Sequence, residues 1–208
     1  IIKKTDLRAF RNPRQGGIIA VGVSKDDAVI AAEITDGQGQ VFLGTREGKA
    51  IRFKEQNVRP MGRIARGVRG INLRDQDEVV AMAVVRPGGT LLTVTENGYG
   101  KRTELDEYRV QSRGGLGIIN IQTSARNGRV AGIAYVENED ELMLITQQGK
   151  VLRMDTKDIR PIGRATQGVR LIEIDEQDLV VSLARLVDAA SDDEEEHSDP
   201  EHAPEAAG

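Results

Sequence analysis

The chain contains no cysteine and no tryptophan, and aromatic residues make up only 3% of its 208 residues. The absence of cysteine excludes disulfide bonds and thiolate-bound metals, and it is typical of a protein from a reducing cytoplasm. Both histidines, His197 and His202, lie near the carboxyl end, so residues 1–187 offer no histidine for acid–base catalysis or metal binding. Apolar runs are short, so the sequence predicts no transmembrane helix.

The formal net charge of −4 conceals two parts of opposite sign. Residues 188–208 hold nine acidic residues and neither lysine nor arginine, which leaves 29 basic and 24 acidic residues in 1–187, a formal charge of about +5. A block of like charges predicts a disordered acidic tail. We expect this tail either to compete with an anionic ligand of the basic body or only to keep the chain soluble.

One sequence pattern recurs along the chain. The segments TREGKAIRF (45–53), TENGYGKRT (95–103) and TQQGKVLRM (146–154) align without gaps. Their glycines are 50 and 51 residues apart, and a second glycine follows each of them by 19 residues. The first set is Gly48, Gly98 and Gly149, and the second is Gly67, Gly117 and Gly168. A partial copy is visible in IIKKT at 1–5 and GIIAVGV at 17–23.

Each repeat reads as four strands. In the unit around Gly48 the expected strands are 40–45, 49–53, 67–73 and 79–85, and Gly48 is expected in the left-handed conformation of a bulged hairpin. Repeats of about 50 residues with four strands are typical of propeller-like blades. The sequence therefore predicts an all-β, β-pinwheel or propeller-like fold. Its units are about 1–37 (incomplete), 38–88, 89–138 and 139–187, with the tail at 188–208. Two separate small β domains are the alternative, but no linker divides the chain.

Basic residues recur at three matched positions in each unit: in the returning strand, in the loop after it, and four residues before the second glycine. The candidate ligand-binding residues are Lys4, Arg52, Arg102 and Arg153 at the first position, Arg59, Arg109 and Arg160 at the second, Arg63, Arg113 and Arg164 at the third, and also Lys101 and Lys150. Repeated guanidinium groups predict evenly spaced phosphate contacts. The alternative is that these arginines join neighbouring blades by pairing with acids such as Glu104 or Asp155.

The scarcity of aromatic residues narrows the ligand. Readers of single strands and RNA loops need aromatic side chains on which bases stack, and the chain has three Phe and three Tyr. A curved basic body therefore favours duplex DNA, bound through its backbone and bent. The sequence contains no catalytic constellation, and Tyr99, Tyr108 and Tyr135 all fall in or beside expected strands, which makes none of them a cleavage nucleophile.

The sequence resembles the C-terminal domain of the DNA gyrase A subunit over about residues 1–187. The resemblance is carried by EGKAIRFKEQNVRPMGRIARGVRGINL, GYGKRTELDEYRVQSRGGLGI and GKVLRMDTKDIRPIGRATQGVRLI. It implies a β-pinwheel that wraps duplex DNA around a basic rim, in an amino-terminally truncated fragment of a type II topoisomerase that contains no catalytic residue. The sister enzyme topoisomerase IV, and a protein-interaction propeller, are the alternatives.

The family's signature box, Gln-Arg-Arg-Gly-Gly-Lys-Gly, has a degenerate counterpart here. Its matching residues are Gln111, Arg113, Gly114, Gly115 and Gly117, while Ser112 and Leu116 replace two basic residues. We expect Gly114 and Gly115 to allow a close backbone approach. By blade order this copy belongs to a later blade, and the true box would lie upstream of Ile1.

The resemblance also implies the setting of the chain. The whole enzyme would be a cytoplasmic, nucleoid-associated A2B2 heterotetramer of gyrase A and gyrase B, which introduces negative supercoils with ATP and Mg2+ bound on other parts. For this chain the resemblance implies double-stranded DNA as the partner and no cofactor or metal. Without the upstream blades, we expect DNA binding to persist and chiral wrapping to be weak.

Overall fold

The computed structural model describes residues 1–13, 15–74 and 76–186, and the predicted acidic tail lies outside them. Regular structure in this part consists of strands and 3-10 helices of three or four residues, η1 (Leu7–Phe10), η2 (Glu55–Asn57), η3 (Leu105–Glu107) and η4 (Thr156–Asp158). None of the described helices has the length and apolar character needed to cross a membrane. The strands are β1 (Gln40–Thr45), β2 (Lys49–Lys54), β3 (Val79–Val85), β4 (Thr90–Thr95), β5 (Tyr99–Glu104), β6 (Ile118–Ile119), β7 (Val130–Val136), β8 (Glu141–Thr146), β9 (Val151–Asp155), β10 (Val169–Arg170) and β11 (Val180–Leu186).

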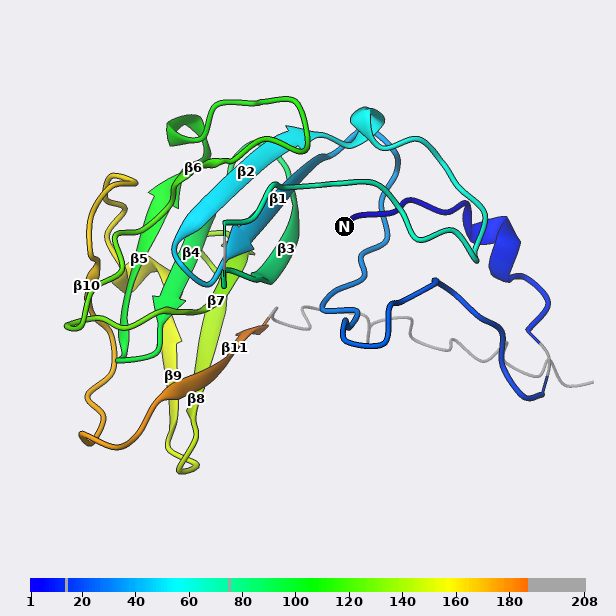
Figure 1. Cartoon of the computed structure of the whole chain (residues 1–208). Coiled ribbons are helices and arrows are strands. Elements are labelled where there is room, and N and C mark those ends of the chain that lie inside the picture. Colours follow the sequence, from blue (N-terminus) through cyan, green and yellow to red (C-terminus); the bar gives the residue numbers. More distant parts are fainter. Residues whose placement is uncertain (14, 75, 187–208) are drawn as a thin grey trace, which may run out of the picture.

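Three antiparallel sheets lie side by side (Figure 1). Their strand orders are β3-β1-β2-β6, β7-β4-β5-β10 and β11-β8-β9. The strands β3, β7 and β11 occupy the same edge of their sheets, and β7 packs between the other two. This arrangement confirms the predicted all-β, propeller-like fold of repeated blades.

The outer strand of a sheet comes from the next unit of the chain, which the sequence prediction of four strands per unit did not include. In the second sheet from the amino end, for example, β10 of the following unit pairs with β5 through Val169 and Gly100. The same exchange joins β6 to β2, and residue Val68 to Ile2. Neighbouring units are therefore linked by backbone hydrogen bonds as well as by side-chain packing.

We call the exchanged segment of each unit a strap, and the three straps are residues 58–71, 108–121 and 159–172. Each strap is buried at both of its ends and largely accessible between them. Its first residue closes a 3-10 helix and its last residue is an isoleucine of the core. The buried first residues are Val58, Tyr108 and Ile159, and the buried last residues are Ile71, Ile121 and Ile172.

The core lies between the sheets, and the middle strands β1 and β4 are buried on both faces. In β1, Val41 and Leu43 pack toward the amino-terminal unit, while Phe42 packs toward the following unit. The ring of Phe42 meets that of Tyr108 edge to face, with 5.2 Å between centroids. Burying an apolar side chain of this size contributes about 1.5–3 kcal/mol, so these contacts supply much of the adhesion between blades.

The hairpin turns confirm the predicted role of their glycines. Gly48, Gly98 and Gly149 have φ angles of 81°, 78° and 86°, a region that L side chains rarely adopt. In two of the turns a threonine oxygen accepts a hydrogen bond from a backbone N–H, since Lys49 N lies 3.1 Å from Thr45 Oγ1 and the fourth unit repeats this bond.

The incomplete first unit departs from the sequence prediction. Residues 17–23, expected as a strand, have no strand hydrogen bonds in the described structure. In the complete blades the equivalent segment pairs with the returning strand of the preceding unit, and the described residues contain no such partner. Apart from η1 and the bridges that Ile2 and Lys4 make to the strap segment 58–71, residues 1–13 and 15–37 are irregular chain, lying mostly on the right of Figure 1.

The strap glycines determine how closely a strap approaches the sheet that receives it. A Cβ atom added to Gly67 or Gly168 would lie 2.5 Å or 2.7 Å from a backbone carbonyl oxygen, and one on Gly117 would lie closer still to Ala50 O. By contrast, nothing lies nearer than 3.5 Å to a Cβ on Gly114 or 3.7 Å to one on Gly115. The space for a Cβ atom is thus absent at Gly117 but present at Gly114 and Gly115, which meet the preceding unit through backbone hydrogen bonds to Gly70 and Asn72.

We predict that Gly117→Ala destabilises the chain by at least about 2 kcal/mol, because it combines a φ of 69° with contact to backbone that cannot rotate away. Urea denaturation measures the change. Gly62→Ala is the matched control, since a Cβ there meets open space, and equal midpoints for the two variants would contradict the prediction.

Candidate nucleic-acid interface

The first series of basic residues joins blades. Arg52 lies in β2, and its Nη1 donates to Leu105 O at 2.5 Å and to Tyr108 O at 3.2 Å, at the 3-10 helix of the next unit. Its Nε donates to Gln40 Oε1 at 2.6 Å. Gln40 lies in the neighbouring strand β1, whereas Leu105 and Tyr108 belong to the next unit. Arg52 therefore joins two blades.

The same contact recurs on either side of Arg52. Arg102 Nη1 donates to Thr156 O at 2.7 Å, and its Nη2 donates to Asn138 Oδ1 at 2.6 Å. Lys4 Nζ lies 3.4 Å from Glu55 O and from the carboxylate of Glu55. The acceptors are the first residues of η2, η3 and η4. Burial lowers the pKa of the Arg102 guanidinium, which remains charged because an arginine pKa in proteins lies far above neutrality.

Burial restricts what these residues contact. Arg102 is 4% exposed and Lys101 is fully buried, so neither presents its charge to a phosphate in this conformation. Lys4, Arg52 and Arg102 therefore join neighbouring blades, which is the alternative that the sequence left open. Their acceptors include backbone carbonyl groups, whereas the sequence suggested acidic side chains. Arg153 is exposed and pairs with Glu141 within its own sheet.

Lys101 anchors the strap 159–172 from the buried side. Its Nζ donates to Thr103 Oγ1 at 3.0 Å, Gly163 O at 2.9 Å and Arg164 O at 2.6 Å. Burial, with a smaller contribution from the charge of Arg164, lowers the pKa of Lys101 from 10.5 to about 7. Lys150 directly precedes β9, is exposed, and donates a hydrogen bond to Glu173 O.

The third series also binds backbone carbonyl groups, and each acceptor lies in the unit before that of its arginine. Arg113 Nη1 donates to Arg69 O at 3.0 Å, and its Nε donates to Asn57 O at 2.9 Å. Arg63 Nη1 donates to Ile19 O at 2.8 Å, and Arg164 Nη1 donates to Ile119 O. Each arginine uses part of its five N–H donors in this way. All three side chains are half-buried at the middle of the strap, and Arg164 Nε is buried without a hydrogen-bond partner among the described residues.

The second series has a different environment. Arg59, Arg109 and Arg160 are exposed, and none of them has a hydrogen bond or ion pair with any described residue. Each follows the buried first residue of its strap, so the alternation of side chains along an extended backbone directs it away from the core. The fold thus presents three unpaired guanidinium groups at equivalent points of consecutive straps.

The structure brings the degenerate box together on the middle strap. Gln111 N donates to Arg52 O at 2.8 Å, and Gly114 N donates to Gly70 O at 2.5 Å. Gly115 O accepts from Asn72 N at 2.8 Å. The box residues therefore bind one strap to the returning strand before it and to the strap beside it. Only Arg113 among them carries charge.

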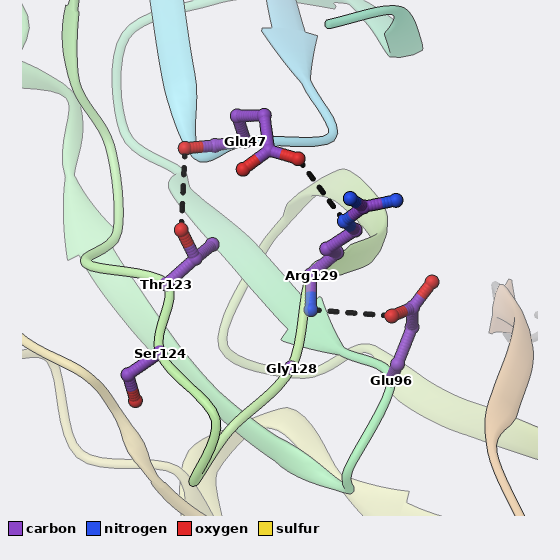
Figure 2. Close-up of a pocket in the computed structure, with 6 residues that line it drawn as sticks. All are labelled: Glu47, Glu96, Thr123, Ser124, Gly128 and Arg129. Atoms are coloured by element: carbon purple, nitrogen blue, oxygen red, sulfur yellow. Dashed lines mark hydrogen bonds and ion pairs between the residues drawn. The ribbon is translucent and has the colours of Figure 1, made fainter. Parts of the chain in front are cut away.

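A polar hollow of about 450 Å3 lies at the hairpin end of the blades (Figure 2). Arg129 Nε pairs with Glu47 Oε1 at 3.0 Å, and Arg129 N donates to Glu96 Oε2 at 3.2 Å. The charged side chains that line this hollow are paired, and two of them are carboxylates, so the hollow does not suit an anion. Among the described residues, no group of three or more His, Asp or Glu side chains is placed to hold a metal ion.

Sequence reasoning missed two exposed arginines that lie against Tyr99. The guanidinium carbons of Arg126 and Arg170 are 4.9 Å and 5.3 Å from the centroid of its ring. Neither arginine recurs as part of the three matched series. The signal that was available is the repeat spacing of 51 residues in place of 50, which marks an extra residue near Arg126.

Comparison with known proteins places this geometry in a family. The family model described as "DNA gyrase C-terminal domain, beta-propeller" matches residues 1–36, 39–86, 89–137 and 140–186. The chain is 47% identical over 184 residues to the DNA gyrase A subunit of Haloquadratum walsbyi, covering 88% of the chain and 22% of that protein. It is 46% identical to the DNA gyrase A subunit of Salmonella typhimurium over 193 residues, again 22% of the relative. The chain therefore spans about a fifth of the length of these relatives.

Solved structures agree in fold. The C-terminal domain of DNA topoisomerase IV superposes with a TM-score of 0.84 at 26% identity, covering 88% of this chain and 58% of that one. The DNA gyrase A C-terminal domain superposes with a TM-score of 0.77 at 28% identity, covering 83% and 59%.

We predict that Arg102→Met lowers the free energy of unfolding by about 3 kcal/mol, because Thr156 O and Asn138 lose a charged donor in a buried site. Arg153→Met, which removes an exposed charge at the equivalent position, is expected to change it by less than about 1 kcal/mol. Chemical denaturation of both variants measures the difference, and similar losses would show that Arg102 does not join the blades.

The lowered pKa of Lys101 predicts a pH dependence of stability. Between about pH 7 and 10.5 the unfolded chain binds a proton at Lys101 that the folded chain does not, so this group makes the free energy of unfolding rise with pH. Denaturation of wild type and Lys101→Met at a series of pH values isolates the contribution. The difference between them is expected to grow in favour of wild type from pH 7 to 10, and parallel curves would contradict it.

Proposed function

Because the chain belongs to the DNA gyrase C-terminal domain family, we propose that it binds the sugar–phosphate backbone of double-stranded DNA along its straps and bends the duplex around the blades. The observation that carries the proposal is the row formed by Arg59, Arg109 and Arg160. These side chains are exposed, unpaired among the described residues and repeated at one position per unit. Each planar guanidinium offers two parallel N–H donors to a phosphate.

The third series supports the same interface. Arg63, Arg113 and Arg164 lie four residues farther along each strap, and the carbonyls that they bind fix their side chains before any ligand arrives. A preorganised donor loses less side-chain entropy when it binds. We therefore assign these arginines both a structural contact and a share of the phosphate contacts, while Lys4, Arg52, Lys101 and Arg102 hold the blades in register.

Duplex DNA fits better than single strands because the chain has no exposed stacking surface. The six aromatic residues all lie within the described residues, and none of them belongs to the exposed class. Proteins that bind single strands rely on accessible aromatic rings for base stacking. Contacts to a regularly spaced backbone need only regularly spaced charge, which is what the straps supply.

In the full-length protein we propose that this domain wraps DNA within a gyrase complex made with the remaining parts of gyrase A and with gyrase B. That complex would introduce negative supercoils in the cytoplasm with ATP and Mg2+ bound on other domains. The three sheets, of four, four and three strands, give a short binding path. We therefore expect this chain to bind and bend DNA while constraining little chiral writhe by itself.

Topoisomerase IV is the second candidate, because its C-terminal domain gives the TM-score of 0.84. The two domains share one fold, so superposition alone separates them poorly. The relatives at 46% and 47% identity are gyrase A subunits, whereas the topoisomerase IV structure is 26% identical, and we favour gyrase on this ground. An activity assay of the full-length protein distinguishes the two candidates. Introduction of negative supercoils indicates gyrase, whereas preferential decatenation of linked circles indicates topoisomerase IV.

We predict that replacing Arg59, Arg109 and Arg160 by Gln weakens binding to a duplex of mixed sequence and lowers the slope of log K against log salt by about 2.7, which is three phosphate contacts at 0.9 each. Fluorescence anisotropy at several salt concentrations measures both quantities. The effect should be the same for unrelated duplex sequences, because these contacts read no bases.

The matched control replaces three exposed basic residues that are already ion-paired, Arg8 with Asp6, Arg129 with Glu47, and Lys157 with Asp155. It removes the same number of positive charges from side chains that lie outside the three straps. If both triple variants lose affinity equally, the binding is a general response to charge and the strap interface is wrong.

A further inference from the structure

One loop breaks the regularity of the repeat. The segment between the strap and the inner strand is one residue longer in the third unit, from Gly117 to Val130, than in the second and fourth units. The extra length lies in residues 122–129, and this loop carries Arg126. A loop that differs from its counterparts is not required by the shared fold, so its features call for a separate explanation.

The loop is held in a fixed shape by Asn127, which is fully buried. Its Oδ1 accepts from Ser124 N at 2.8 Å and from Ser124 Oγ at 2.9 Å. Its Nδ2 donates to Gln122 O at 2.9 Å and to Gln167 O, on the following strap, at 3.0 Å. Arg126 therefore projects from a loop that is fastened to the neighbouring unit.

Arg126 meets a second arginine over one tyrosine ring. Arg170 is the register partner of Tyr99 in the β10–β5 pair, and its Nη2 donates to Tyr99 Oη at 3.0 Å. Both guanidinium carbons lie within 5.3 Å of the Tyr99 ring centroid. Tyr99 itself is 6% exposed, while both arginines are exposed. The hydrogen bond from Arg170, and then the one from Arg126, lower the pKa of the Tyr99 hydroxyl.

The preceding blade shows that this arrangement is not part of the repeat. There the equivalent register pair is Lys49 with Ile119, which brings no second cation to the strand. Like charges on neighbouring strands repel each other. Within the described part of the chain, the acidic partner of this pair is Glu173, at 4.0 Å from Arg170 Nη1, so the surroundings compensate little of the charge.

We propose that Arg126 and Arg170, positioned by Tyr99, form a phosphate-binding pair that takes the backbone of duplex DNA at the hairpin end of the strap 159–172. Each guanidinium stacks on the ring and keeps most of its N–H donors accessible. An anion between or beside the two groups offsets their repulsion. Arg170 shares its strap with Arg160 and Arg164, so the pair extends the same row of basic residues.

The inference rests on the proposed function, because a phosphate pair of this kind also suits free inorganic phosphate. The continuity with Arg160 and Arg164 favours the polymer, whose successive phosphates reach several points on one strap. It also makes the binding path asymmetric, since the second unit has no equivalent pair. A duplex would be held more firmly at the third and fourth units than at the second.

The test compares wild type with the double variant Arg126→Gln/Arg170→Gln in the whole chain. For a mixed-sequence duplex at about 0.1 M salt we expect roughly a tenfold or greater loss of affinity and a salt slope lower by about 1.8. Arg8→Gln/Lys157→Gln, at two ion-paired residues outside the loop 122–129, is the control with the same charge change, and it should leave both quantities close to those of wild type. Equal losses in the two double variants would overturn the proposal.

Two further measurements separate the remaining outcomes. Tyr99→Phe keeps the ring but removes the hydroxyl that holds Arg170, so affinity should fall about twofold to threefold with an unchanged salt slope, since no charge is lost. Inorganic phosphate, titrated at constant ionic strength, tests the other source. Saturable binding of phosphate that the double variant loses, with DNA affinity unchanged, would assign the pair to free phosphate and refute the DNA contact.

Failure of this inference and failure of the proposed function look different. If wild type binds DNA with a slope that depends on Arg59, Arg109 and Arg160 while the Arg126/Arg170 variant equals wild type, only the pair is refuted. If wild type shows no salt-dependent DNA binding, the strap interface and the pair fail together. Thermal melting of each variant confirms that the folded state is being compared.

Discussion

Neighbouring units of this chain are joined because each strap completes the sheet of the unit before it. The exchange depends on a glycine at the start of the strap strand, such as Gly117, where backbone approaches backbone too closely for any Cβ atom. A strap that stood farther away would break the pairing of Ile118 with Ala50. The blades would then be held by side-chain packing and side-chain hydrogen bonds alone, and the straps would no longer lie in register beside each other.

The exchange also decides which side chains become available to a ligand. A strap is anchored at both ends by buried residues, for example Tyr108 and Ile121. Between the anchors it crosses the outside of another unit, so its polar side chains divide into two groups. Arg113 turns toward carbonyl groups of the adjacent strap, whereas Arg109 has no acceptor in reach among the described residues and extends outward. The row of Arg59, Arg109 and Arg160 is therefore a consequence of the exchange of straps between units.

Much of the architecture could be predicted from the sequence because it is repeated and local. The left-handed turn at Gly98 follows from a four-residue pattern, and three aligned copies identify the blades. The contact of Arg102 with Thr156 could not be predicted in this way, because the acceptor is a backbone carbonyl 54 positions away and any residue supplies one. Likewise, the sequence contains Arg126 and Asn127 but does not reveal that the Asn127 side chain is buried and fixes the loop beside Tyr99. The strand expected at 17–23 is absent for a related reason, since its pairing depends on a partner from another unit.

The blade-joining contacts have a consequence for how such a chain diversifies. Lys4, Arg52 and Arg102 all bind the main-chain oxygen of the first residue in a 3-10 helix, and that residue is Glu55, Leu105 or Thr156. An acidic, an aliphatic and a hydroxyl residue all supply this acceptor, because it is a main-chain oxygen, and only Glu55 adds an ion pair through its side chain. Duplicated units can therefore drift apart in sequence without losing their mutual attachment, and a single unit can acquire a private feature, as the third unit has done with its longer loop.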